Sequence, residues 1–412
     1  MDIFTNGFLR FQEQLSYKMI SKINNPEVLQ FIQKHLNEDP AEIALQAKRY
    51  PDLPIREIAV QIASRKKAKS KLPEWWSNPE VIFPPKQNLE QASSEITARF
   101  KQRWVGGKSI LDLTGGSGVD LFYMSKFFER VVYVEPNEEL MQIAEHNFRL
   151  FGKEIETYAV KAEAFLNHTS EEFDVIYIDP SRRDSNKKRV FGMEDYQLNV
   201  AELYEKLLKV GKEIIIKTSP MIDLNHTLRL LPNTFKVQVL AVDNEVKEVL
   251  FYLRKDFVDV PVIEAWNISE TKEEEQFSFI SEEEKKSISE YSEPLKYVYE
   301  PNSAIRKAGA FNLISSCFGL KKLHPNTHLY TSNKIKEDFP GRIFEVKGLI
   351  KPNKKEIRKA FPDGIVNVIS KNFPMGANEI KKKFRLKDGG EEFLVFCEAE
   401  QLGKIALNCS LL

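Results

Sequence analysis

Apolar positions along this chain follow two different periods. In residues 1–86 they recur at helical spacing, as in the run from Ile55 to Ile62. Between residues 87 and 256, short apolar runs alternate with amphipathic stretches. We expect strands at 109–113, 131–135, 155–160, 173–178, 213–217, 235–242 and 248–255. The pattern predicts a helical domain and then an α/β domain, with a mostly parallel sheet covered by helices on both faces.

The last two expected strands are joined only by Asp243-Asn244-Glu245. So short a connection fits a hairpin and adds an antiparallel strand to the sheet. Residues 257–335 begin with runs of like charge, for which we expect a linker, and continue into a small α+β unit from about 294. Residues 336–412 predict a second small α+β unit.

Charge changes this picture only locally, because 60 Lys and Arg balance 60 Asp and Glu over the 412 residues. Residues 347–387 hold twelve basic and three acidic side chains, with Lys381, Lys382 and Lys383 in succession. A solvated surface explains such a run, and so does contact with RNA or another polyanion. Lys and Arg at 65–71 beside Trp75-Trp76 leave the same two interpretations open.

Several function classes are disfavoured. Cys317, Cys397 and Cys409 are widely spaced, and the histidines form no ligand motif, so we expect reduced thiols and no metal. No run of about 18 apolar residues and no leader pattern occurs, which predicts a cytoplasmic protein without membrane contact.

The candidate cofactor site begins at SILDLTGGSGVD, residues 109–120, a strand followed by a Gly-rich turn and a helix. Leu121 stands where a dinucleotide motif has its third glycine, which counts against NAD and FAD. Acidic and hydroxyl side chains suit the ammonium of S-adenosylmethionine, and glycines allow close backbone approach. The residues concerned are Asp112, Thr114 and Asp120, with Gly115, Gly116 and Gly118.

Two further strand ends complete this site. Glu135, after the second strand, can accept hydrogen bonds from ribose hydroxyls or serve as an ordinary strand-end charge. After the third strand, Glu163 offers an acceptor for an adenine amine.

Asp179-Pro180 follows a strongly apolar strand and lies at the carboxyl edge of the sheet. Its carboxylate and carbonyl can orient an acceptor for in-line attack on an activated methyl group. Ser181, Arg182 and Arg183 come next; the arginines suit a substrate phosphate or carboxylate, or a salt bridge within the protein. No cysteine lies near these strand ends, which disfavours covalent thiolate attack.

These motifs resemble class I S-adenosylmethionine-dependent methyltransferases, whose sheets also end in a hairpin. LDLTGGSGVD looks like their first motif, the strand ending in Glu135 their second and FDVIYIDPSRRD their fourth. The resemblance implies a Rossmann-like seven-stranded methyltransferase sheet at 87–256 and an adenine contact at Ala162 and Glu163.

The full layout resembles the bacterial THUMP-like-domain methyltransferases, with EQASSEITARFK before the first motif, IIIKTSPMID at the fifth strand and a basic C-terminal unit. This implies a ferredoxin-like unit within 257–335, a THUMP-like domain at 336–412 and RNA as substrate. We therefore expect methylation of a nucleobase in tRNA or rRNA. A protein or small-molecule substrate, or an RNA-binding protein that keeps the cofactor pocket without transfer, remain alternatives. Arg182 replaces the aromatic residue of amine-methylating relatives, so the acceptor atom stays open.

Overall fold

The computed structural model describes residues 18–180, 198 and 200–412. They form two compact units, residues up to 234 with 250–258, and residues 235–249 with 259–412. Among the described residues, no helix is long and apolar enough to cross a membrane.

The N-terminal region is helical, as predicted. Ile55, Ile58, Ala59 and Ile62 are buried together on one face of the longest of these helices. The helices are α2 (Lys18–Ile23), α3 (Pro26–Lys34), α4 (Pro40–Leu45), α5 (Ile55–Lys71), α6 (Pro73–Ser77), α7 (Lys86–Gln91) and α8 (Glu95–Lys101). Short 3₁₀ turns occur at η1 (Gln46–Lys48), η2 (Gln102–Trp104) and η3 (Ser125–Phe127).

A nine-stranded sheet follows in the order β3-β2-β1-β4-β5-β7-β6-β8-β9. Strands β1 to β5 pair in parallel with their neighbours, as the apolar runs predict. The strands are β1 (Ser109–Asp112), β2 (Arg130–Val134), β3 (Glu156–Tyr158), β4 (Phe173–Ile178), β5 (Gly211–Thr218), β6 (Thr234–Val242), β7 (Glu245–Arg254), β8 (Val262–Ile268) and β9 (Glu275–Ile280).

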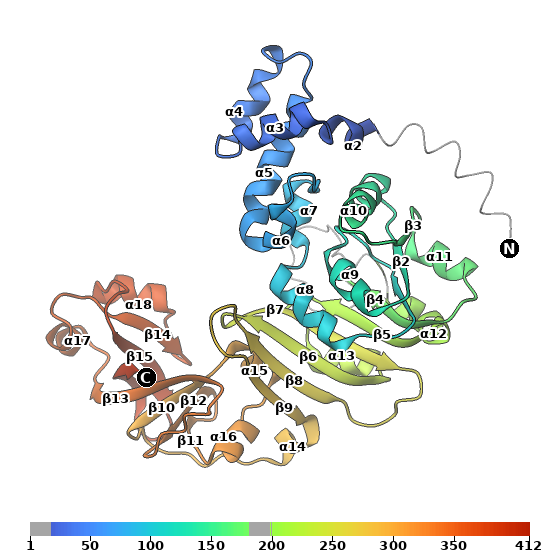
Figure 1. Ribbon diagram of the computed structural model, residues 1–412. Helices are drawn as coiled ribbons and strands as arrows, with labels where there is room; N and C mark the ends of the chain where they lie inside the picture. Colours follow the sequence, from blue (N-terminus) through green and yellow to red (C-terminus); the bar gives the residue numbers. More distant parts are fainter. Residues whose placement is uncertain (1–17, 181–197, 199) are drawn as a thin grey trace. The chain divides into compact units, whose positions relative to one another are not determined.

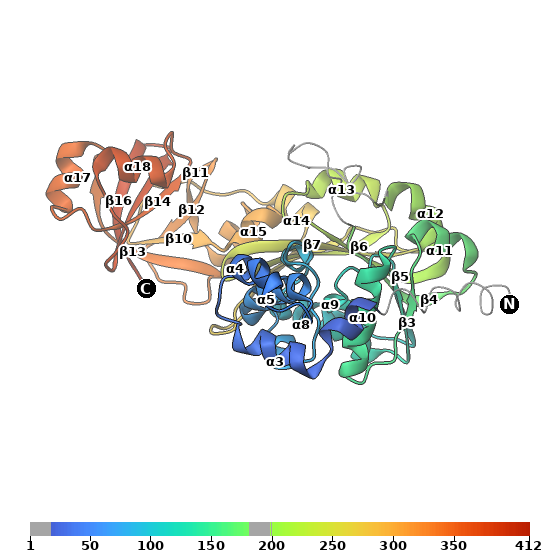
Figure 2. The ribbon, with the colours of Figure 1, turned by 90° about the horizontal axis from the view of Figure 1, so that it is seen from above.

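Helices cover both faces of strands β1 to β5 (Figure 2). Helices α9 (Val119–Met124) and α10 (Glu138–Leu150) lie on one face, while α12 (Val200–Val210) and α13 (Leu224–Leu230) lie on the other. Helix α11 (Ala162–His168) connects β3 to β4. This part of the chain has the expected Rossmann-like architecture.

The predicted hairpin is present, because Val242 ends β6 and Glu245 begins β7. Asp243 and Asn244 both have positive φ, 49° and 64°, the backbone geometry of a tight two-residue hairpin turn.

The expected linker after residue 256 was wrong in part, and the sheet has nine strands where seven were expected. Strand β8 pairs in parallel with β6, and β9 pairs antiparallel with β8. The charged residues Lys272 to Glu274 belong to the short loop between β8 and β9 and not to a longer linker. Helix α14 (Ser281–Lys286) follows.

The C-terminal regions share one seven-stranded sheet, in the order β11-β12-β10-β13-β16-β15-β14. It is antiparallel except where β14 pairs with β15. Its strands are β10 (Tyr297–Pro301), β11 (Lys321–His324), β12 (Thr327–Ser332), β13 (Gly341–Ile350), β14 (Asn367–Lys371), β15 (Glu392–Ala399) and β16 (Gly403–Leu411). Its shorter helices are α15 (Ser303–Ala308) and α16 (Leu313–Phe318).

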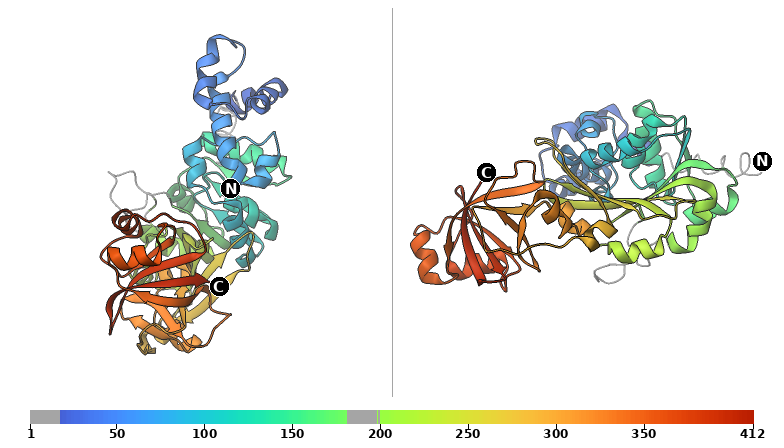
Figure 3. Two further views of the ribbon diagram at one scale, coloured as in Figure 1. Left: turned by 90° about the vertical axis from the view of Figure 1, so that its left-hand side faces the viewer. Right: turned by 90° about the horizontal axis from the view of Figure 1, so that it is seen from below.

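Helices α17 (Lys354–Ala360) and α18 (Ala377–Phe384) lie side by side on one face of this sheet (Figure 3). Ile357, Ile380 and Phe384 from these helices pack with Leu394 and Phe396 of β15. Burial of these apolar faces leaves the polar faces of both helices to solvent.

Candidate active site

Three strand ends meet at one edge of the first sheet. Asp112, the last residue of β1, is in register with Tyr133 of β2 and Tyr177 of β4. The chain then keeps its pairing into the loop, since the Gly115 amide donates to the Val134 carbonyl at 3.0 Å. The residues that follow β1, β2 and β4 therefore lie close together, as the sequence predicts.

The Gly-rich loop needs its glycines for two physical reasons. Gly116 and Gly118 have φ of +58° and +73°, where a side chain is strained. A Cβ on Gly115 would lie 2.3 Å from the Tyr133 ring, and one on Gly118 would lie 2.5 Å from the Phe148 ring. Gly115 and Gly118 thus let the loop pack tightly against the protein itself.

Glu135 ties this loop to the end of β2. Its Oε2 accepts a hydrogen bond from the Gly116 amide at 2.9 Å, and its Oε1 accepts from the Asn137 amide at 2.8 Å. The carboxylate is buried. Tyr133, which the sequence did not indicate, donates to the Gly116 carbonyl at 2.7 Å and holds the same turn.

Asp112 is a buried carboxyl group that lacks a cationic partner among the described residues. Its Oδ1 accepts from the Thr114 amide at 2.9 Å. Burial raises the pKa of Asp112 to about 8, and the neighbouring carboxylates Asp120, Asp179 and Glu135 add to the rise. A cation bound beside such a group would favour its charged form.

Asp120, on the first turn of α9, has the opposite environment. Lys101 at the end of α8 lies 3.1 Å from its Oδ1, and Lys217 of β5 lies 3.3 Å from its Oδ2. Ser93 and Tyr177 donate to Oδ2 at 2.8 and 2.7 Å. Although burial opposes ionisation, Lys101 and Lys217 hold the pKa of Asp120 well below its ordinary value.

Asp179 lies beside this cluster and is the more accessible of the two carboxylates. Its Oδ2 is 2.5 Å from Lys217 Nζ, and its amide donates to Thr114 Oγ1 at 2.6 Å. The side chain is 35% exposed, while Pro180 is buried. Burial raises the pKa of Asp179, and Lys217 opposes that rise.

The remaining predicted residues lie in different surroundings. Ala162 is buried at the first position of α11, and the neighbouring Glu163 is exposed. Ser181, Arg182 and Arg183 lie outside the described residues. Lys381, Lys382 and Lys383 are on α18, in the other compact unit.

The basic and aromatic residues before the sheet have mainly structural contacts. Arg65 is buried and donates to the carbonyls of Pro79 and Val81 at 2.5 and 2.6 Å. Trp75 is buried against Phe122 and Phe151. Neither side chain is available to a nucleic-acid strand.

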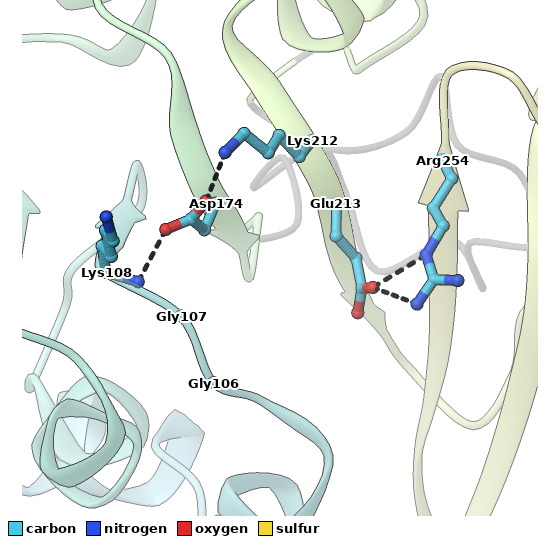
Figure 4. A pocket seen from close by; sticks show the side chains of 7 residues that line it. All are labelled: Gly106, Gly107, Lys108, Asp174, Lys212, Glu213 and Arg254. Carbon is cyan, nitrogen blue, oxygen red and sulfur yellow. Dashed lines mark hydrogen bonds and ion pairs between the residues drawn. The ribbon is translucent and has the colours of Figure 1, made fainter.

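A shallow pocket of about 510 Å³ lies at the opposite, amino-terminal ends of β4 and β5 (Figure 4). It is lined by Gly106, Gly107, Lys108, Asp174, Lys212, Glu213 and Arg254. Four of its charged residues form pairs, Asp174 with Lys212 at 2.7 Å and Glu213 with Arg254 at 2.9 Å, and Lys108 adds a further cation. This pocket is separate from the three strand ends. No cluster of His, Cys, Asp and Glu within the described ranges could hold a metal ion.

The chain is similar to known proteins along most of its length. Residues 297–340 match a family described as a ferredoxin-like domain, residues 341–410 match one described as THUMP domain-like, and residues 88–229 match one described as conserved hypothetical protein 95. A crystal structure from Porphyromonas gingivalis W83, assigned as a methyltransferase, is 31% identical with a TM-score of 0.83. The similarity covers 95% of this chain and 98% of that one.

An uncharacterized S-adenosylmethionine-dependent methyltransferase of Mycobacterium tuberculosis, found in two strains, is 22% identical over 327 residues. The match covers 78% of this chain and 87% of the mycobacterial protein.

Proposed function

The chain belongs to the S-adenosylmethionine-dependent methyltransferases with a THUMP-like domain, and we propose that it methylates RNA. It is a class I enzyme whose cofactor supplies a methyl group on a positively charged sulfur. In this proposal the substrate is tRNA or rRNA, the acceptor is a nucleobase, and transfer is direct and in line.

The strand-end residues of the first sheet fit this cofactor. Asp112 offers a buried carboxyl group without a cationic partner among the described residues, which suits the ammonium of the methionine end. We assign Thr114, Gly115, Gly116, Gly118 and Asp120 to the same end; Asp120 acts from within its lysine cluster. Glu135 would bind the ribose. Each of its two oxygens accepts one backbone hydrogen bond, which fixes the carboxylate and leaves each oxygen able to accept a second bond from a ribose hydroxyl. Ala162 and Glu163 would contact the adenine.

Asp179 and Pro180 would frame the acceptor. Asp179 is fixed by Thr114 on one side and Lys217 on the other, so its carboxylate has a set orientation. Fixed orientation is what in-line transfer requires, since the methyl group is already activated. We assign Ser181, Arg182 and Arg183 to substrate binding, as the motif predicts.

The single observation that favours RNA is the basic surface of the THUMP-like domain. Of the twelve basic residues between 347 and 387, Lys347, Lys371 and Lys381 form ion pairs with Glu345, Glu300 and Asp388. The other nine are exposed and form no ion pair within the described part of the chain. They are Lys351, Lys354, Lys355, Arg358, Lys359, Lys382, Lys383, Arg385 and Lys387. Cations without ion-pair partners on two adjacent helices and the segments beside them suit a phosphate backbone.

The test is incubation of the full chain with methyl-labelled cofactor and total RNA from cells that lack it. We expect label in RNA, and we expect Asp179→Asn to abolish transfer while cofactor binding survives. Asp174→Asn, on the same strand at its other end, is the matched control and should leave transfer unchanged. Label in protein or in small molecules but not in RNA would contradict the proposal. Salt-sensitive RNA binding without any transfer would instead indicate a binding protein.

A further inference from the structure

An ammonium group lies directly against the proposed acceptor site. Lys217 Nζ is 2.5 Å from Asp179 Oδ2 and also donates to Ser93 Oγ at 2.9 Å. The Lys217 side chain is only 10% exposed, whereas Asp179 is 35% exposed. A nearly buried cation is thus fixed against a carboxylate that solvent still reaches.

A second Asp–Lys pair on the same two strands provides a comparison. Asp174 and Lys212 pair at 2.7 Å at the amino ends of β4 and β5, where Lys212 is 58% exposed. An exposed pair of this kind has little effect on stability in either direction. Burying Lys217 costs desolvation free energy, and well-packed apolar side chains would stabilise the fold as well or better. Lys217 also pairs with the buried Asp120 at 3.3 Å, but Asp120 already has Lys101 at 3.1 Å. The contact of Lys217 with Asp179 therefore points to a role in the reaction.

Possible acceptors in RNA differ in the charge that they develop. An exocyclic amine, or a ring nitrogen with a free lone pair, becomes positive as it takes the methyl group, and a fixed ammonium nearby opposes this. A ribose 2′-hydroxyl, or a ring N–H nitrogen such as guanine N1 or uracil N3, must first give up a proton. It then attacks as an anion, which a fixed ammonium favours.

We propose that the acceptor is a group of this second kind, that Asp179 takes its proton, and that Lys217 is the residue that positions Asp179. The inference rests on the proposed RNA methyl transfer. The acceptor's electron pair forms the bond to the methyl carbon, and the carbon–sulfur bond breaks with its electrons retained by sulfur. The acceptor proton passes to Asp179 and then to water, so charge balances. Burial raises the pKa of Asp179, which makes it a better proton acceptor than an ordinary aspartate.

The first experiment identifies the labelled nucleoside formed by the full wild-type chain in total RNA. Label in 2′-O-methylnucleosides, or in N1-methylguanosine or N3-methyluridine, would support the inference. Alkaline digestion distinguishes ribose from base methylation, because only 2′-O-methylation leaves alkali-resistant dinucleotides. Label in N6-methyladenosine, N4-methylcytidine, N7-methylguanosine or a carbon-methylated base would overturn it and leave RNA methylation standing. Absence of label from every RNA would overturn the proposed function as well.

The second experiment tests Lys217 itself, with transfer measured against pH. We expect Lys217→Met to lower kcat by about 100-fold or more. Its rise in rate should move to higher pH, because the ammonium no longer opposes the raised pKa of Asp179. The other charged groups that act on the pKa of Asp179 stay in place: Asp120 raises it and Lys101 lowers it. Lys217→Arg should restore much of the rate, and the matched control Lys212→Met should behave as wild type. Cofactor affinity and melting temperature, measured for each variant, separate catalysis from folding. If Lys217→Met loses activity only in proportion to cofactor binding, with an unchanged pH profile, Lys217 has a structural role alone.

Discussion

We expect Asp112 to couple cofactor binding to the release of a proton. Burial and three neighbouring carboxylates raise its pKa to about 8, so the free protein holds this group mostly protonated at pH 7. An ammonium group beside it would favour the carboxylate, and binding should therefore release a proton. Calorimetry at pH 7 in buffers of different ionisation enthalpy measures this release. Asp112→Asn should abolish it and weaken binding by about 10-fold or more. Equal proton release by both proteins would place the titrating group elsewhere.

The same group makes the stability of the ligand-free protein depend on pH. Its pKa is higher in the folded chain than in the unfolded chain, so the folded state binds more protons between about pH 4 and 8. The contribution of Asp112 to stability is therefore present at low pH and lost as pH rises toward 8. The urea midpoint of Asp112→Asn, relative to that of the wild type, should therefore rise between pH 5.5 and 8.5. A constant difference across that range would mean that Asp112 titrates normally.

Alanine substitutions at Gly116 and Gly118 allow the cost of backbone strain to be distinguished from the cost of a packing overlap. Both have positive φ, which costs a residue with a Cβ about 1–2 kcal/mol. A Cβ on Gly116 meets no atom closer than 3.6 Å, but one on Gly118 would overlap the Phe148 ring. Gly118→Ala should therefore lower the free energy of unfolding by about 1–3 kcal/mol more than Gly116→Ala. Chemical denaturation of the two variants gives this difference, and similar values would show that Phe148 moves aside.

Single residues show where sequence interpretation stops. The strand-end positions of Asp112, Glu135 and Asp179 follow from local pattern, because each comes directly after an apolar strand. Lys101 and Lys217 were missed, because neither contact with Asp120 is visible in local pattern: Lys101 lies before the first strand, and Lys217 is 97 residues from Asp120 in the chain. One signal was available: Lys217 follows Ile214–Ile216 at the same sheet edge as Asp179.

At the scale of elements, strands with alternating burial were the hardest to find. Strand β9 alternates partly buried and exposed positions, and β8 carries Glu264 and Asn267 among its apolar residues. Between them lie six charged or polar residues, 269–274, so the whole segment resembled a linker. Pairing in register with β6 decides the structure here, and that pairing is not visible in local composition.

Glu300 joins three elements of the C-terminal sheet to α15. Its buried carboxylate, 2% exposed, pairs with Arg306 of α15 at 3.2 Å, Lys371 of β14 at 2.6 Å and Arg342 of β13. Glu300→Gln would leave these cations without their anion, so we expect about 2 kcal/mol or more of destabilisation. Glu345→Gln, which removes a more exposed pair on β13, should cost much less. Urea denaturation measures the free energy of unfolding of both variants. Equal losses would show that the buried Glu300 contributes no more to stability than an exposed ion pair.

For the molecule as a whole, the sequence predicted the first sheet but not its extent, and it predicted two small α+β units rather than a second sheet. Strands β10 to β16 form one sheet, although the sequence suggested two small units with a boundary near residue 336. The sequence also overestimated the number of unpaired cations on the basic surface. Lys371 pairs with Glu300, which is distant in sequence, and Lys381 pairs with Asp388, which follows a turn.

The residues proposed to bind RNA and those proposed to transfer the methyl group lie in different compact units, so we expect the two activities to be separable. Lys382→Ala with Lys383→Ala removes two exposed cations of α18 and should weaken RNA binding, with the salt dependence reduced by about 1.4 if the strand is single. Lys285→Ala with Lys286→Ala, two exposed lysines of α14 in the same unit, is the matched control and should change neither. The first pair should raise KM for RNA while kcat and cofactor affinity stay constant, because Asp112 and Asp179 are untouched. An unchanged KM would show that RNA reaches Asp179 without α18, and the charges on that helix would then be an ordinary solvated surface.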